Sequence, residues 1–172
     1  MDFIVNKFIN PYLNQVPVII SPIGTILAMY IIVYLSKLQH AMYSILLMQK
    51  YDIVNASYRN SNSSKKTWTE QVVSRAYNAH ANNWEALLGY CIPVILILQK
   101  KISSNEINQL CNLFIGVRVI YTVLYPLAFS VPISMIRSGV FTIGIAIILK
   151  LFSIAIPSML FVADFKSVID EQ

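Results

Sequence analysis

A line of polar residues precedes a strongly apolar run near the middle of the chain. Arg75, Asn78, Asn82 and Glu85 are spaced three, four and three residues apart, so an α-helix would carry them on one face. The run Ala86–Leu98 that follows is typical of a segment inside a membrane. Because a carboxylate is costly in hydrocarbon, we expect Glu85 to face a bundle interior and to find cationic partners there.

Two arginines are the candidate partners of Glu85. Counted from the short turn near residues 100–104, Glu85 and Arg118 both lie about 21 Å into the membrane, at about 1.5 Å per residue. Arg137 comes shortly after the start of the last helix, which begins on the membrane side opposite that turn. We therefore expect Glu85, Arg118 and Arg137 to converge in the cytoplasmic third of the bundle. They could form a buried ion network that fixes helix register. They could also line a cavity for an anionic ligand with a carboxylate at each end, which is the interpretation we favour.

The third apolar segment adds hydroxyl groups beside these charges. Arg118, Tyr121, Thr122 and Tyr125 are spaced so that they share one helical face. We therefore expect this face to be a polar, aromatic wall beside Glu85.

The composition indicates an integral membrane protein. Of 172 residues, 56% are hydrophobic and only 12% are charged. The net charge of +5 is scattered among apolar runs without a basic stripe, so we expect no nucleic-acid partner. The positive charge suits a cytoplasmic membrane face or an anionic ligand. Cys91 and Cys111 have no metal-ligand spacing, and we expect no metal site.

The pattern of apolar runs and helix-start signals predicts a single all-α domain over residues 1–172. The Asn- and Ser-rich stretch 51–66 separates the first two runs, and Thr67–Glu70 and Ser103–Glu106 have the form of capping boxes. The predicted four-helix bundle has helices at roughly 16–50, 67–99, 104–126 and 132–162. Because cations concentrate around the loop between helices one and two, we expect that loop to be cytoplasmic. The short second turn predicts that helices two and three are antiparallel neighbours.

Three motifs in this order resemble one known family. They are Arg75 with Ala79-His80, Asn82 and Glu85; Arg118 with Thr122 and Tyr125; and Ile136-Arg137-Ser138. The chain is similar over nearly its whole length to the membrane-associated proteins of eicosanoid and glutathione metabolism (the MAPEG family). That family includes microsomal glutathione transferases and the prostaglandin E and leukotriene C synthases.

The resemblance implies a homotrimer that binds glutathione between protomers near the cytoplasmic side of the membrane. It implies that glutathione is the cosubstrate, and that a lipophilic electrophile or lipid hydroperoxide arrives from the membrane lipid. The host membrane would be the endoplasmic reticulum in a eukaryote or the inner membrane in a bacterium. The glutathione-binding residues that we infer by matching position are Arg75, Asn82, Glu85, Arg118, Thr122, Tyr125 and Ser138.

The same resemblance implies that Arg137 is catalytic and holds the glutathione sulfur as a thiolate. This role is chemically sensible, since a thiol with a pKa near about 8.5 ionises more readily beside a guanidinium. His80 lies off the stripe of Asn82 and Glu85, and we interpret it as a hydrogen-bonding group at a helix contact. Lys37 and His40 are the nearest cationic candidates on helix one.

Two departures from the family pattern leave two functions open. Phe141 stands one turn after Arg137, where some members carry a tyrosine, and Ala81 stands where the prostaglandin synthase has an arginine. The first function is a glutathione transferase, with peroxidase activity as a related reaction. The alternative is a non-catalytic lipid- or glutathione-binding membrane scaffold with the same fold.

Overall fold

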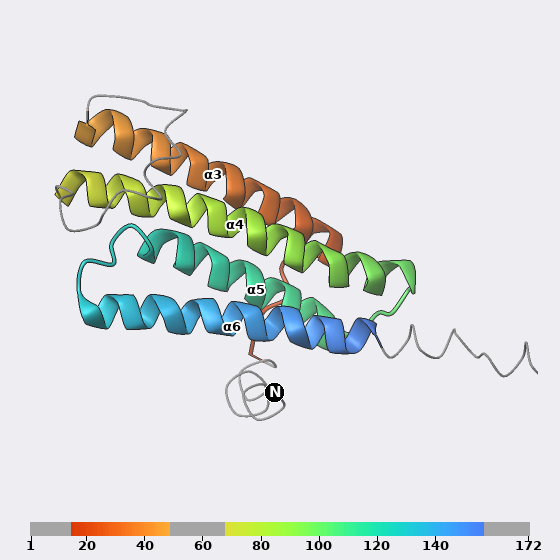
Figure 1. The fold of residues 1–172 in the computed structure, drawn as a ribbon. Helices are drawn as coiled ribbons and strands as arrows, with labels where there is room; N and C mark the ends of the chain where they lie inside the picture. The colour runs from red at the N-terminus through yellow and green to blue at the C-terminus, as the bar shows by residue number, and fades with distance from the viewer. Residues whose placement is uncertain (1–14, 49–67, 157–172) are drawn as a thin grey trace, which may run out of the picture.

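The computed structural model describes residues 15–48 and 68–156, and every described element is a helix (Figure 1). The helices are α3 (Pro22–Met48), α4 (Trp68–Gln99), α5 (Asn105–Leu124) and α6 (Val131–Ala155). Each of them is long and apolar enough to cross a membrane. The prediction of an all-α membrane bundle with four spans in this order is therefore confirmed for the described part of the chain.

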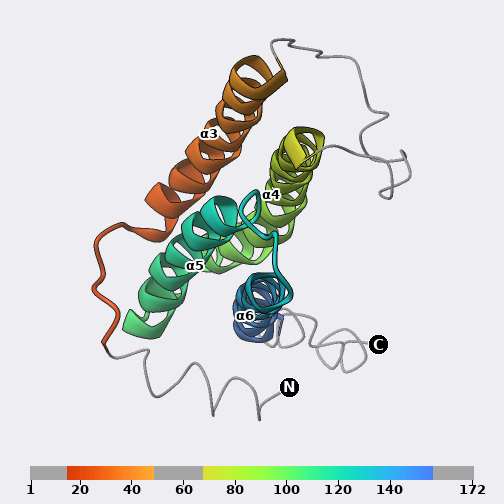
Figure 2. The ribbon, with the colours of Figure 1, turned by 90° about the vertical axis from the view of Figure 1, so that its left-hand side faces the viewer.

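The four helices pack as a square bundle in which α4 and α5 occupy opposite corners. Along the perimeter α3 packs against α4 and α5, and α6 packs against the same two helices (Figure 2). The prediction that helices two and three are antiparallel neighbours is confirmed in part: α4 and α5 touch through a few polar side chains, whereas α4 packs most extensively against α3. The turn after α4 is short, but it connects two helices across the diagonal. A short loop fixes the antiparallel direction of two helices without making them the closest pair.

The first helix begins later than its apolar run suggests. The sequence predicts a start near residue 16, whereas α3 begins at Pro22, which is well suited to a first helical turn. Ser21 caps this start, because its Oγ accepts a hydrogen bond from the Gly24 amide at 3.3 Å. Residues 16–20 remain outside the helix, and their polar backbone groups need other partners.

Asn112 of α5 supplies those partners. Its Oδ1 accepts hydrogen bonds from the backbone N–H groups of Ile19 at 3.2 Å and Ile20 at 3.0 Å. Its Nδ2 donates to the Ile20 carbonyl at 2.7 Å. One amide side chain thus satisfies three backbone groups and attaches the entry segment to α5.

The predicted capping box at the start of helix three is only partly right. The N-cap is Ser104, whose Oγ accepts from the Ile107 amide at 3.2 Å. Glu106 does not return to the cap; it forms an ion pair with Lys150 of α6 at 3.4 Å. The box at Thr67, the loop 51–66 and the last predicted turns, at residues 157–162, lie outside the described residues.

Polar contacts recur along the α3–α4 interface inside an otherwise apolar core. Thr25 and Tyr90 share a hydrogen bond of 2.6 Å between their hydroxyl groups, and the Tyr90 ring stacks on Phe114 at 4.2 Å. Farther along, His80 Nδ1 lies 3.1 Å from the Val33 carbonyl oxygen. The interpretation of His80 as a helix-contact group is thereby confirmed.

Replacing Asn112 by alanine is expected to detach the entry segment. Three hydrogen bonds to exposed or partly buried backbone groups would be lost, a cost of about 1–3 kcal/mol. We expect a lower midpoint of thermal unfolding in detergent and faster proteolysis near residues 16–20. The matched control is Asn108→Ala, one turn earlier on the same helix. Equal unfolding midpoints for the two variants would contradict the role of Asn112.

Candidate functional site

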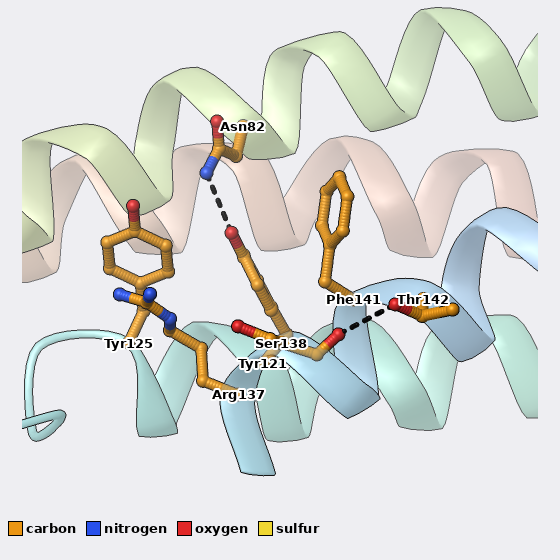
Figure 3. Close-up of a pocket in the computed structure, with 7 residues that line it drawn as sticks. All are labelled: Asn82, Tyr121, Tyr125, Arg137, Ser138, Phe141 and Thr142. Carbon is orange, nitrogen blue, oxygen red and sulfur yellow. Dashed lines mark hydrogen bonds between the residues drawn. The ribbon is translucent and has the colours of Figure 1, made fainter. Parts of the chain in front are cut away.

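A cleft of about 260 Å³ opens among α4, α5 and α6 (Figure 3). It contains four of the site residues predicted from the sequence: one from α4, one directly after the end of α5 and two from α6. The full lining is Asn82, Tyr121, Tyr125, Arg137, Ser138, Phe141 and Thr142. The helices thus bring together side chains that are far apart in the sequence.

Arg137 supplies the positive charge of the cleft. Its guanidinium carbon lies 4.7 Å from the centre of the Tyr125 ring, and its Nη2 donates to Ser134 Oγ at 3.2 Å. The side chain is half-buried, and no carboxylate in the described ranges pairs with it. The charge is therefore available to an anionic group that enters the cleft.

Tyr121 forms another wall of the same cleft. It is 2% exposed, and its hydroxyl oxygen accepts a hydrogen bond from Asn82 Nδ2 at 2.7 Å. Figure 3 shows Asn82 pointing from α4 to this hydroxyl. The Phe141 ring lies beside the phenol, with 5.9 Å between the ring centres.

Arg118 lies behind the cleft rather than in its lining. The residue is 2% exposed, and its Nη2 donates to the backbone carbonyl of Asn82 at 2.8 Å. Its guanidinium carbon lies 4.7 Å from the centre of the Tyr121 ring. The count from the turn predicted Arg118 level with Glu85, whereas its guanidinium contacts the backbone of Asn82, one helical turn before Glu85, and the ring of Tyr121.

The prediction that Glu85 faces the bundle interior is wrong for the single protomer. Glu85 is exposed, and it makes no ion pair with Arg118 or Arg137. The inner face of α4 carries Ala79, Asn83 and Tyr90 instead. Glu85 is two residues beyond Asn83, about 200° around the helix, so it points outward. The interpretation as a buried ion network within one protomer therefore fails.

Thr122 is buried on the far side of Arg118. Its Oγ1 donates to the Arg118 carbonyl at 2.8 Å and accepts from Asn83 Nδ2 at 2.9 Å. Thr122 is not among the residues that line the cleft. It holds α5 against α4 beside the site.

Arg75 stands nearer the ends of the helices, outside the cleft lining. Its guanidinium carbon lies 4.9 Å from the centre of the Phe129 ring, and its Nη2 donates to Gln71 at 3.2 Å. Its charge and that of Arg137 are close enough to repel each other. The two arginines therefore give one end of the site a positive potential.

The cationic candidates on the first helix lie away from the cleft. His40 is 3% exposed, and its ring lies 5.5 Å from that of Tyr77 on α4. Lys37 is half-buried on α3. Among the described residues no group of three or more histidines, cysteines and acids could hold a metal ion.

Sequence reasoning did not assign Tyr121, Phe141 and Thr142 to the site, although all three line it. Signals for two of them were present. Tyr121 falls on the predicted polar face of α5, and Thr142 follows Ser138 by one helical turn. Phe141 gave no polar signal, because its contribution is an apolar wall.

A guanidinium, two phenols and a serine hydroxyl around one cleft can bind an anion and stabilise developing negative charge. The MAPEG family model matches residues 17–156 of this chain. Comparison with curated proteins and with solved structures returns no match.

Replacing Arg118 by alanine is expected to loosen the contact between α5 and α4. A charge-assisted hydrogen bond to Asn82 and the packing on Tyr121 would be lost, at a cost of about 2 kcal/mol. Thermal unfolding in detergent should show a lower midpoint than for wild type. The control is Lys101→Ala, which removes an exposed cation. Should Arg118→Ala melt like that control, the buried guanidinium contributes no net stability.

Proposed function

Because the chain belongs to the MAPEG family, we propose that it is a membrane-bound glutathione transferase whose substrates are lipophilic electrophiles. The observation that carries this proposal is Arg137, a cation without a carboxylate partner in the described ranges, in a cleft that also holds Tyr125 and Ser138. Such a site suits a tripeptide that has carboxylates at both ends and a thiol between them.

In this proposal Arg137 favours ionisation of the bound thiol. The S–H bond breaks, the electron pair stays on sulfur, and the proton passes to water at the mouth of the cleft. The thiolate then forms a bond to the electrophilic carbon while a leaving group departs with its electron pair. With a lipid hydroperoxide, two glutathione molecules would give the disulfide, the lipid alcohol and water.

The remaining predicted ligands divide between direct contact and support. Asn82 and Ser138 line the cleft and would hydrogen-bond the peptide part of glutathione. Arg75 would attract a carboxylate toward the end of the site where it neighbours Arg137. Arg118 and Thr122 would act through the wall that they hold in place.

We also propose that the working form is a homotrimer in the membrane. A cleft of about 260 Å³ is smaller than the usual ligand pocket of about 300–1,000 Å³, so a second copy would enlarge the site. Glu85 is exposed in a helix that is long and apolar enough to cross a membrane, and lipid would not solvate its carboxylate. A neighbouring protomer would cover Glu85 and bring it a cation or glutathione itself.

A second candidate function is a non-catalytic scaffold that binds lipid or glutathione. Phe141 favours it, because α6 offers no phenol to the sulfur one turn after Arg137. A scaffold would bind without turnover. The purified protein with a chlorodinitrobenzene and glutathione would separate the two functions.

Glu85→Gln is expected to weaken the assembly or the binding of glutathione without unfolding the protomer. The exposed carboxylate makes no ion pair within the described protomer, so its removal should leave the helices in place. Native mass spectrometry would report the oligomer, and calorimetry the dissociation constant. Leu88→Gln is the control, a polar change at another exposed position of α4. An unchanged trimer with unchanged affinity would place Glu85 in contact with water.

Arg137→Leu is expected to lower the chemical rate more than the affinity. Without the guanidinium the pKa of the bound thiol should rise toward that of free glutathione, because the thiolate loses its counter-charge. Ultraviolet absorbance at neutral pH would show a thiolate with wild type and none with the variant. Arg137→Lys, which keeps the charge, should give an intermediate signal. A variant that forms thiolate as readily as wild type would place the activating group elsewhere.

A further inference from the structure

A second hollow lies on the side of the bundle formed by α3 and α5. Figure 2 shows these two helices side by side, with α6 on the other side of α5. The groove between them has a volume of about 220 Å³, and its lining is Ile32, Leu35, Gln39, Val119, Thr122 and Val123. None of these residues lines the cleft that holds Arg137. We call this hollow the α3–α5 groove.

The walls of the α3–α5 groove are apolar and face outward. Ile32 and Thr122 are buried and form its floor, whereas Leu35, Val119 and Val123 are exposed and form its rim. Both helices are long and apolar enough to cross a membrane, so hydrocarbon is the medium that such a rim suits. A molecule that enters the groove would therefore come from the lipid.

Gln39 is the polar group of this lining that still needs a partner. Its Oε1 is buried, and no group in the described part of the chain donates a hydrogen bond to it. The Thr122 hydroxyl is already used, because it donates to the Arg118 carbonyl and accepts from Asn83. Rotation of the Gln39 amide about its last bond would turn Oε1 to the groove, since that torsion is soft. Hydrocarbon supplies no donor there, so an unmade hydrogen bond is costly.

The polar and apolar parts of the α3–α5 groove lie at different depths. Gln39 and Thr122 each lie about 26 Å from the start of their helix, at about 1.5 Å per residue. The last residue of α5 is Leu124, so this part of the groove is close to the end of a span. Ile32 lies about 10 Å from Gln39 toward the middle of α3. An amphiphile with its polar end at Gln39 would thus extend its hydrocarbon part into the membrane.

The chemistry of the lining selects the polar end of that amphiphile. None of the six described lining residues is charged, so a carboxylate, phosphate or ammonium group would lack a counter-charge in hydrocarbon. A plain hydrocarbon would leave the Gln39 oxygen without a donor. A hydroxyl is neutral and donates a hydrogen bond, so it meets both conditions.

We propose that the α3–α5 groove binds an uncharged lipid alcohol from the membrane. Its hydroxyl donates to Gln39 Oε1, and its hydrocarbon part packs on Ile32 and between Leu35 and Val119. The lipid is a bound ligand, and no covalent bond forms or breaks. This site is separate from the proposed transferase chemistry, because Arg137 and the cleft lie among α4, α5 and α6.

The test uses a long-chain alcohol that carries a photoreactive diazirine on its chain, together with the methyl ether of the same probe. The ether keeps the chain and the oxygen but cannot donate a hydrogen bond. The purified full chain in phosphatidylcholine nanodiscs is irradiated with each probe, and peptide mass spectrometry locates the label. We expect label on the peptides that contain Leu35 and Val123. The ether should label them about threefold to tenfold less, the effect of one neutral hydrogen bond.

Gln39→Leu removes the amide and keeps an apolar side chain on α3. It should abolish the preference for the alcohol, so that the two probes label the groove equally. The matched control is Tyr34→Phe, which removes a hydroxyl from another exposed position of α3, one that contacts Trp84 of α4. Tyr34→Phe should keep the wild-type preference.

Val123→Phe tests the groove independently of the amide. The larger ring at this exposed rim position should occupy the hollow and exclude both probes, whether or not Gln39→Leu assembles. Ile120→Phe is its control, since Ile120 is equally exposed on α5 but does not line this groove. It should be labelled like wild type.

The labelling pattern decides the proposal. Preference for the alcohol that is lost in Gln39→Leu, with label lost in Val123→Phe, supports it. Equal labelling of wild type by alcohol and ether, or a preference that persists in Gln39→Leu, overturns it. Absence of label from the groove also overturns it, and a disulfide between two Leu35→Cys protomers would then assign this face to a second copy.

Discussion

The structure depends on one buried contact, in which the Arg118 guanidinium of α5 donates to the Asn82 backbone carbonyl of α4. A charge in this position has no water around it, and within the described protomer no carboxylate neutralises it. The Asn82 carbonyl oxygen and the face of the Tyr121 ring stabilise the positive charge instead. Because α4 and α5 are diagonal in the bundle, this contact also fixes the distance across its centre.

Two consecutive asparagines of α4 donate hydrogen bonds to residues of α5 beside Arg118. Asn82 turns to Tyr121 and the cleft, whereas Asn83 turns inward to Thr122. Two such contacts on consecutive residues fix the rotation of α4 about its own axis. With that rotation Glu85 points outward, so the protomer presents both an open cleft and an exposed carboxylate. Both features suit a protein whose site is completed by another copy, which is the assembly that we propose.

Much of the architecture could be predicted from the amino-acid sequence. The length and spacing of the apolar runs predicted four spans, and over the described residues α4, Trp68–Gln99, agrees with the predicted helix at 67–99. Depth was equally predictable, because each helical residue advances about 1.5 Å. Counting from a turn placed Arg118 level with Glu85, and in the structure its guanidinium contacts Asn82, one helical turn before Glu85. The count also predicted that Arg137 approaches this level, whereas the gathering of Ser138 and Asn82 with Arg137 was implied by the family resemblance.

The sequence by itself thus determined which segments are long and apolar enough to cross a membrane and how far along its helix each polar residue lies, whereas only the tertiary structure decided which way those residues face. Glu85 and Asn83 occupy nearly the same depth, and the spacing of polar residues favoured Glu85 as the inward one. In the structure Asn83 faces inward, because its side-chain amide donates a hydrogen bond to Thr122 of α5. The start of α3 was decided similarly, since Asn112 lies far away in sequence and satisfies the backbone before Pro22. Residue spacing fixes position along a helix axis, but rotation about that axis depends on contacts with other helices.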